Sequence, residues 1–203
     1  MKIEKKVLDM SLAGIFTAII IAMSVVPFLG YIPLGFMNAT IIHVPVIIGA
    51  IILGPKYGAY LGLVFGVTSL VKATIAPGVT SFGYSGNMWS AVIAIVPRVC
   101  IGIVAYFVYK LIMKAAHGIK GSQTVALWVA GIAGAMTNTL LVMNGIYIFF
   151  GQSYAAASNK AVEHIYDVIL GIILGFGIPE AIVAGILTTA ITKVLFKIMK
   201  DNG

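Results

Sequence analysis

Cysteine, charge and the motifs of familiar enzymes are all scarce in this chain of 203 residues. Its one cysteine, Cys100, lies inside an apolar run (IVPRVCIG), which excludes a disulfide framework or a thiolate metal cluster within the chain. No GxxxxGKS/T phosphate loop, HExxH zinc pair or GxSxG nucleophile elbow is present. The sequence therefore gives no reason to expect an enzyme, an ATPase site, or a metal or cofactor bound by this chain.

Charged residues make up only 9% of the chain, against about a quarter in soluble globular proteins, and hydrophobic residues make up 61%. The mean hydropathy of +1.09 points in the same direction. A soluble fold could not cover so much apolar surface, so the composition indicates an integral membrane protein.

Positive charge is sorted along the chain instead of being scattered. Ten of the 13 basic residues lie at or near the ends of long apolar stretches: Lys2, Lys5, Lys6, Lys56, Lys110, Lys114, Lys120, Lys193, Lys197 and Lys200. If those stretches are membrane helices, the clusters fall at every second connection, as expected when basic residues stay on the cytoplasmic side. The net charge of +7 then reflects membrane topology and not nucleic-acid binding. We expect the protein in the plasma membrane of a prokaryotic cell, with both termini in the cytoplasm.

The apolar stretches predict six membrane-spanning helices, because a bilayer core of roughly 30 Å needs about 20 helical residues. Five spans are expected near residues 9–26, 38–53, 57–74, 88–109 and 124–150. The second is short, so we expect it to lean on its neighbours or to stop below one interface.

The last third of the chain holds an apolar segment, 165–176, that is only half a membrane long and is separated by GIP from 180–196. If both pieces crossed the bilayer, the C-terminal lysines would lie opposite the N-terminal ones, against the charge rule. We therefore expect 180–196 to be the sixth span and 165–176 to be a partial or re-entrant element. The predicted fold is an all-α bundle of six transmembrane helices, with residues 1–203 as one membrane domain.

Small residues recur at intervals of four in two of the predicted helices, which lets another backbone approach closely. One series, in the third helix, consists of Gly54, Gly58, Gly62 and Gly66. The other, in the first helix, consists of Gly14, Ala18 and Ala22. Contact within the bundle is the favoured interpretation for the third helix, and one of the two faces could instead meet another protein.

Arg98 lies ten residues into the helix that starts near Met88, or about 15 Å deep at 1.5 Å per residue. A charge at that depth costs at least roughly 2.5–3.5 kcal/mol on insertion scales, so it should face protein or water and be paired. Three partners remain open. They are Glu180, the carbonyl groups that Pro97 leaves unbonded, and a bound ligand.

Other polar residues in the apolar stretches are further candidates for a binding site. Asn87 falls on one helical face with Arg98, two alanines between them, which suits either a cavity wall or a helix cap. Asn138 and Asn144 are six residues apart, about 120° out of superposition, so both cannot point into one narrow pocket. His43 is expected to be a buried histidine bonded to a backbone carbonyl, with ligand contact as the alternative.

Two more candidates lie near the predicted outer end of the third helix. Lys72 could attract an anion or simply extend to the interface. The following segment, 75–87 (IAPGVTSFGYSGN), contains Tyr84 and suits either a mobile lid or a plain extracellular loop. The six acidic residues, Glu180 included, are interpreted as too peripheral to form a proton relay.

Three segments carry a resemblance to a known family: PLGFMNATIIHVPVIIGAIILGPKYGAYLGLVFG, IVPRVCIG and GFGIPEAIVAGILTTAI. The chain resembles the substrate-binding S-components of energy-coupling factor (ECF) vitamin transporters, and within that family it is most like the pantothenate-specific type. The resemblance implies high-affinity capture of a vitamin from outside. It also implies a transmembrane coupling protein and two cytoplasmic ATPases as partners, which use the ATP, and delivery of the vitamin by toppling in the membrane.

The resemblance also implies roles for particular residues. Family members contact the coupling protein through small residues of the first helix, and Gly14, Ala18 and Ala22 match apart from the leading glycine. Arg98 or Lys72 would neutralise a carboxylate in the outer half of the bundle, beneath a lid formed by 75–87. Hydrogen bonds to the ligand would come from Asn87, Asn138 and Asn144, with His43 and Tyr84 as further contacts.

Pantothenate suits this set of residues because it is a small monoanion with hydroxyl groups and one amide. The alternatives are an S-component for another vitamin, riboflavin or folate, and a stand-alone secondary carrier. An ion-coupling acid near the middle of the membrane would favour the carrier.

Overall fold

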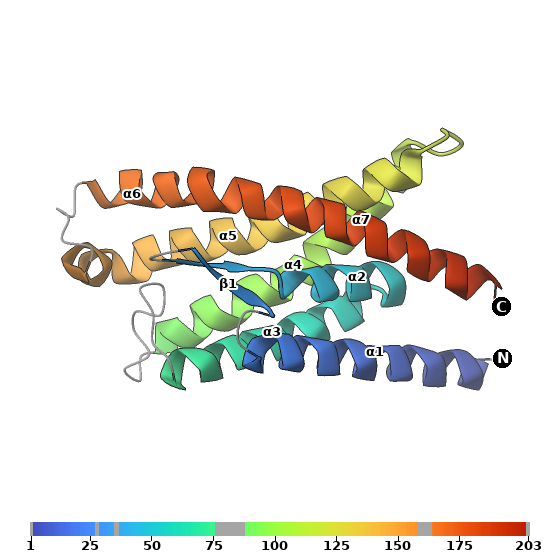
Figure 1. Ribbon diagram of the computed structural model, residues 1–203, viewed down its shortest axis with the longest axis horizontal. Coiled ribbons are helices and arrows are strands. Elements are labelled where there is room, and N and C mark those ends of the chain that lie inside the picture. The colour runs from blue at the N-terminus through green and yellow to red at the C-terminus, as the bar shows by residue number, and fades with distance from the viewer. Residues whose placement is uncertain (1, 27–28, 35–36, 76–87, 158–163, 202–203) are drawn as a thin grey trace.

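The computed structural model describes residues 2–26, 29–34, 37–75, 88–157 and 164–201. Its elements, in chain order, are α1 (Lys2–Val25), β1 (Tyr31–Leu34), β2 (Met37–Thr40), α2 (His43–Leu53), α3 (Pro55–Ile75), α4 (Met88–Ala115), α5 (Ser122–Ala157), α6 (Ile165–Ile172), the π-helical turn η2 (Ile173–Gly177) and α7 (Ile178–Asp201). The helices run along the long axis of the molecule, and both termini lie at the same end (Figure 1).

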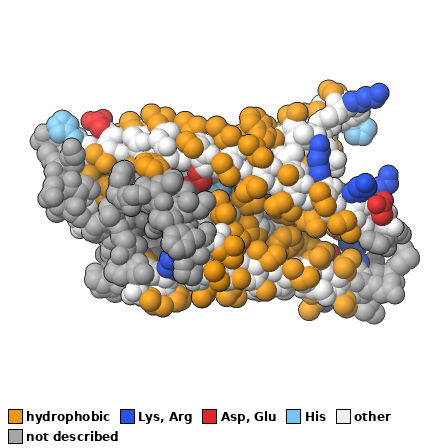
Figure 2. Space-filling view, viewed as in Figure 1, with side chains coloured by type: hydrophobic (Ala, Val, Ile, Leu, Met, Phe, Trp, Pro, Cys, Tyr) orange, Lys and Arg blue, Asp and Glu red, His pale blue; other side chains and the backbone are white. Residues whose placement is uncertain are grey.

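The helices form the membrane-spanning bundle that the sequence predicts. In the described part of the chain, five helical stretches are long and apolar enough to cross a bilayer, and α2 is a shorter apolar helix. Apolar side chains cover the visible face of the bundle, and basic side chains gather at the end that holds the termini (Figure 2). The all-α membrane fold is confirmed, with a small β-hairpin added to it.

The short helix α2 forms the centre of the core. All of its residues from His43 to Ile51 are buried, and it contacts α1, α3, α4, α5 and α7. Ile47 and Ile48 are among the largest side chains that are buried completely. A helix of 11 residues spans only about 16 Å, so it is stable in a membrane because neighbouring helices surround it. The expectation that it leans on its neighbours is confirmed.

The predicted start of this second helix at residue 38 is wrong. Residues Met37–Thr40 form strand β2, which pairs antiparallel with β1 from Tyr31↔Thr40 to Leu34↔Met37. A short apolar run does not distinguish a strand from a buried helix by periodicity alone, which is why the hairpin was not predicted. The hairpin carries the chain back into the bundle and brings Thr40 beside α7.

The predicted break at GIP is also wrong. Residues Ile165–Asp201 form one continuous helical run of 37 residues, about 55 Å long and therefore longer than a bilayer core is thick. Pro179 lies inside this run and has no backbone N–H to donate, and the regular α-helical hydrogen-bond pattern changes in the π-helical turn η2 just before it. The chain still crosses only once here, so both termini remain at one end (Figure 1).

Glycines bring α3 and α4 into close contact. A Cβ atom at Gly62 would collide with the backbone carbonyl of Arg98, and one at Gly66 would lie 2.9 Å from Cα of Ile95. A Cβ at Gly58 would lie 2.6 Å from Cβ of Ala50 in α2. Gly54 precedes α3 and has a φ of 99°, which favours glycine where α2 ends. Contact within the bundle is thus confirmed for Gly58, Gly62 and Gly66, whereas a Cβ at Gly54 would meet nothing within 4 Å.

Candidate functional site

A small cavity of about 90 Å³ lies in the bundle where α4, α5, η2 and α7 meet. A cavity of this size holds several water molecules. Its polar lining comes from four elements: Thr40, Arg98, Asn138, Thr139 and Glu180. A Cβ at Gly177 would lie 2.7 Å from Cγ2 of Thr139, so this glycine lets η2 approach α5 at the cavity wall.

Arg98 is held in place by the residue before it. Pro97 has no backbone N–H and therefore leaves the carbonyl of Ile93 without its helical donor. The Nη1 atom of Arg98 donates a hydrogen bond of 2.7 Å to that carbonyl, and the guanidinium carbon lies 5.6 Å from the centre of the Phe65 ring. One of the three predicted partners is confirmed. The guanidinium remains at the cavity wall, where its charge also acts on Glu180.

Glu180 and His43 form a buried acid–base pair beside Arg98. The Oε1 atom of Glu180 lies 3.5 Å from Nδ1 of His43, with side-chain exposures of 13% and 0%. The backbone of Thr40 donates a hydrogen bond to the Glu180 carboxylate. Neither ring nitrogen of His43 has a hydrogen-bond partner among the described residues, so the expected bond to a backbone carbonyl is not found in this part of the chain.

The interpretation of Glu180 as peripheral is also wrong, and the sequence contained a usable signal. An acidic side chain directly after Pro179, inside a long apolar stretch, is costly unless it is paired in the bundle interior. Thr40 was missed because the predicted span 38–53 placed it inside an apolar helix, and Thr139 because threonines are common in membrane helices.

The two asparagines of α5 separate as their spacing predicts. Asn138 lines the cavity, is 9% exposed, and its Oδ1 atom accepts no hydrogen bond from any described residue. Asn144 instead donates from Nδ2 to the carbonyl of Leu140 at 2.8 Å, within its own helix. Asn138 is therefore the asparagine that lines the cavity, and its buried acceptor has no partner among the described residues.

Of the three remaining predicted site residues, only Lys72 is described, and it does not line this cavity. Lys72 lines a surface groove of about 450 Å³ between α1 and α3, together with Ser24 and Thr68. It lies seven residues beyond Phe65, or about 10 Å further along α3. Asn87 and Tyr84 fall outside the described residues, as does the predicted lid beyond Ile75.

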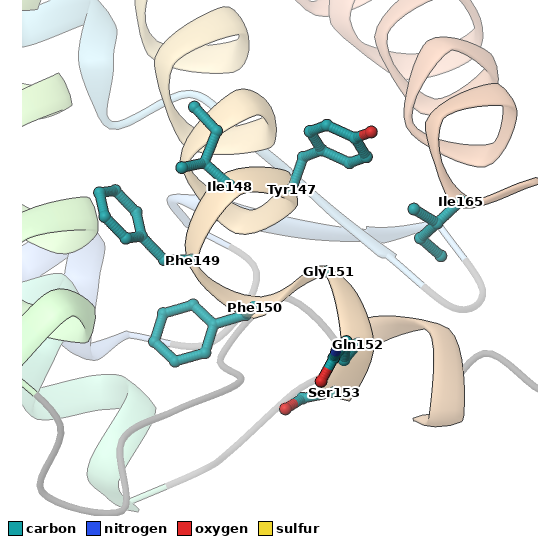
Figure 3. Close-up of a pocket in the computed structure, with 8 residues that line it drawn as sticks. All are labelled: Tyr147, Ile148, Phe149, Phe150, Gly151, Gln152, Ser153 and Ile165. Carbon is teal, nitrogen blue, oxygen red and sulfur yellow. The ribbon is translucent and has the colours of Figure 1, made fainter. Parts of the chain in front are cut away.

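A second pocket, of about 450 Å³, opens where α5 bends (Figure 3). Phe150 has non-helical angles, φ −135° and ψ 16°, at the position where the fifth span was predicted to end. The pocket is lined by Tyr147–Ser153 of α5 and by Ile165. Phe149 stacks on Trp89 at 4.2 Å, and Tyr147 meets Tyr166 edge-on at 5.2 Å. These aromatic rings were not predicted as part of a site.

One side of α1 is open. Gly14, Ala18 and Ala22 are exposed, whereas Phe16 and Ile20 are buried against the bundle. A Cβ at Gly14 would meet nothing within 4 Å. In the described chain this series of small residues is thus free for close approach by another helix, unlike the glycines of α3.

Comparison with known proteins agrees with this architecture. Residues 9–192 match the family described as "ECF transporter, substrate-specific component". The chain is 35% identical over 211 aligned positions to a protein named pantothenic acid transporter PanT from Lactococcus lactis subsp. cremoris, covering 98% of this chain and 99% of that protein. It is 31% identical over 192 positions to the pantothenate transporter PanT of Leuconostoc mesenteroides, covering 93% and 92%. This multi-pass membrane protein therefore belongs to the family of substrate-specific components (S-components) of ECF transporters.

Proposed function

We propose that this chain is the pantothenate-binding S-component of an ECF importer. The observation that carries the proposal is the cavity that joins a guanidinium, Arg98, to an amide with an open acceptor, Asn138. Pantothenate offers the matching groups, a carboxylate and N–H and O–H donors. The two relatives named as pantothenate transporters support the same substrate.

In this proposal the cavity binds the charged end of the vitamin. A space of about 90 Å³ accommodates a carboxylate and a few water molecules rather than the whole molecule. Arg98 neutralises the carboxylate, because a guanidinium offers several donors in the fork that a carboxylate accepts. The Oδ1 atom of Asn138 accepts a hydrogen bond from the vitamin. The low dielectric of the bundle strengthens both interactions.

The remaining site residues take secondary roles in the proposal. The rest of the vitamin extends toward the aromatic pocket at the bend of α5, and the segment 75–87, with Tyr84 and Asn87, closes over it. Lys72 lines a separate groove and therefore does not contact the bound vitamin in this proposal. Its positive charge instead attracts the anion before the anion reaches the cavity. Asn144, which bonds within its helix, contributes only if that hydrogen bond is exchanged for one to the vitamin.

Transport requires partners in this account. The open side of α1, with Gly14, Ala18 and Ala22, binds a transmembrane coupling protein, and two cytoplasmic ATPases supply the energy. The S-component then topples in the plasma membrane and presents the vitamin inward. The basic end of the bundle, where both termini lie, faces the cytoplasm (Figure 2).

Calorimetry on the purified protein in mild detergent tests the substrate. We expect pantothenate to bind with a dissociation constant below about 1 μM, equivalent to about −8 kcal/mol or better. Riboflavin and folate should give no measurable heat at the same concentrations. Tight binding of either of them, with no binding of pantothenate, would contradict the substrate assignment and leave the family unaffected.

A second candidate function is a stand-alone secondary carrier. The acid Glu180, buried in the bundle beside His43, is the observation that favours it, because carriers commonly couple transport to an intramembrane acid. A carrier would accumulate its solute without ATPases, and this difference separates the two candidates experimentally.

A further inference from the structure

Three side chains, from Glu180, His43 and Arg98, set the charge around the cavity. Among the described residues, the titratable or charged groups that face Glu180 are His43 from α2 and Arg98 from α4. Helix α5 contributes the neutral side chains Asn138 and Thr139, and β2 contributes the backbone N–H of Thr40. An ionised Glu180 would offset the positive charge of Arg98, with His43 neutral.

A carboxylate ligand would disturb this balance. If it bound to Arg98 while Glu180 stayed ionised, the cavity would hold two anions and one cation in a medium of low dielectric. Like charges in such a site do not both remain ionised, and a proton is taken up instead. The site provides a place for that proton, because Nδ1 of His43 and Oε1 of Glu180 are 3.5 Å apart.

We propose that Glu180 and His43 make this a proton-linked carboxylate site, in which the pair takes up one proton as the ligand carboxylate binds to Arg98. This inference rests on the proposed function and deepens it. The proton comes from bulk water and forms one O–H bond on Glu180 or one N–H bond on His43. Arg98 then interacts with the ligand carboxylate in place of Glu180, and the net charge of the cavity is the same before and after binding.

The pair therefore determines specificity. A carboxylate ligand binds together with a proton and replaces Glu180 as the partner of Arg98. A ligand without a negative charge cannot replace Glu180 there, so it has to compete with the carboxylate of Glu180 for Arg98. Pantothenol, in which an alcohol replaces the carboxylate of pantothenate, is the matching neutral probe. We expect it to bind at least tenfold more weakly than pantothenate and without proton uptake.

Calorimetry in buffers of different ionisation enthalpy, such as phosphate, HEPES and Tris at pH 7.5, measures the protons taken up per ligand bound. For the wild-type protein and pantothenate we expect about one proton, and for pantothenol about zero. Between pH 7.5 and 8.5 the dissociation constant of pantothenate should rise toward tenfold, because a proton consumed on binding becomes scarcer as pH rises.

The variant Glu180→Gln supplies a permanently neutral group of the same shape. Its affinity for pantothenate should lose this pH dependence and exceed the wild-type affinity at pH 8.5. A purely structural role of Glu180 would lower affinity at every pH and leave the proton count unchanged.

The outcomes separate the two proposals. Pantothenate binding with no proton uptake and no pH dependence in the wild-type protein would overturn the inference alone. A proton count of one retained by a folded Glu180→Gln variant would overturn it as well. If pantothenate does not bind to the wild-type protein at any pH, the proposed function fails, and the inference fails with it. The wild-type measurements decide the question even if the variant does not fold.

Discussion

Neighbouring residues at the centre of α4 show how a membrane helix can hold a charge in position. Pro97 removes one backbone donor, and Arg98 supplies another to the carbonyl of Ile93 that is left free. The arginine therefore satisfies a backbone group and is fixed in orientation by the same contact. Such a fixed guanidinium loses little side-chain entropy when an anion binds.

Removal of this guanidinium tests its role. Arg98→Ala should weaken pantothenate binding by more than tenfold, or above about 1.4 kcal/mol, as measured by calorimetry. The variant also leaves Glu180 without its cationic neighbour, which destabilises a buried site by itself.

The double variant Arg98→Ala/Glu180→Gln is the matched control, because it removes both charges together. It should recover thermal stability in detergent without recovering affinity. Wild-type affinity in the folded double variant would remove Arg98 from the ligand contacts.

The site was only partly predictable from the sequence at this scale. Arg98 and Asn138 could be found because polar side chains deep in apolar stretches are costly and need a purpose. The partner of His43 could not, because Glu180 is more than a hundred residues away and nothing local links the two. Helical spacing predicted that Asn138 and Asn144 could not both face one narrow pocket, but it did not predict which of the two lines the cavity.

Helix pairs are fixed by small residues, and the two series in this chain have different surroundings. The glycines of α3 are covered by α4, whereas the small residues of α1 are exposed. The sequence shows the same spacing in both helices, so the difference follows only from the three-dimensional packing. The same limit applies to the β-hairpin and to the continuous α6–α7 run, where local patterns allowed more than one structure.

The packing of α3 on α4 predicts that replacing a glycine by alanine lowers the stability of the protein at some positions and not at others. Gly62→Ala should destabilise the protein by about 1–3 kcal/mol, because its Cβ would collide with the backbone of Arg98. Gly14→Ala is the matched control and should be neutral or stabilising by up to about 1 kcal/mol, since alanine favours a helix over glycine and nothing lies within 4 Å. Thermal unfolding in detergent compares them, and equal effects would reject the packing argument.

The open side of α1 predicts a defect in assembly without a defect in binding. Ala18→Leu should preserve pantothenate affinity but reduce co-purification with the coupling protein by at least tenfold, because a bulky side chain blocks close approach. Ala190→Leu, a matching change at an exposed alanine of α7, should assemble normally. Undiminished complex formation by Ala18→Leu would assign the interface to another surface.

The whole molecule is an apolar bundle with charge at one end and a small charged cavity inside. Hydropathy and the distribution of lysines predict this arrangement well, since both reflect the bilayer and not particular contacts. The described helices enclose a small polar cavity and leave one helix face open, which suits the proposed capture of a ligand followed by work done on the bundle by other proteins. A carrier with an intramembrane acid remains the alternative to be tested against this account.

Uptake of radiolabelled pantothenate into proteoliposomes tests the central claim most directly. The protein reconstituted alone should bind pantothenate but not accumulate it, with or without a proton gradient. Addition of the coupling protein and the ATPases, with ATP on the side where they are exposed, should produce accumulation above the external concentration. Uphill accumulation by this chain alone would contradict the account and identify it as a secondary carrier.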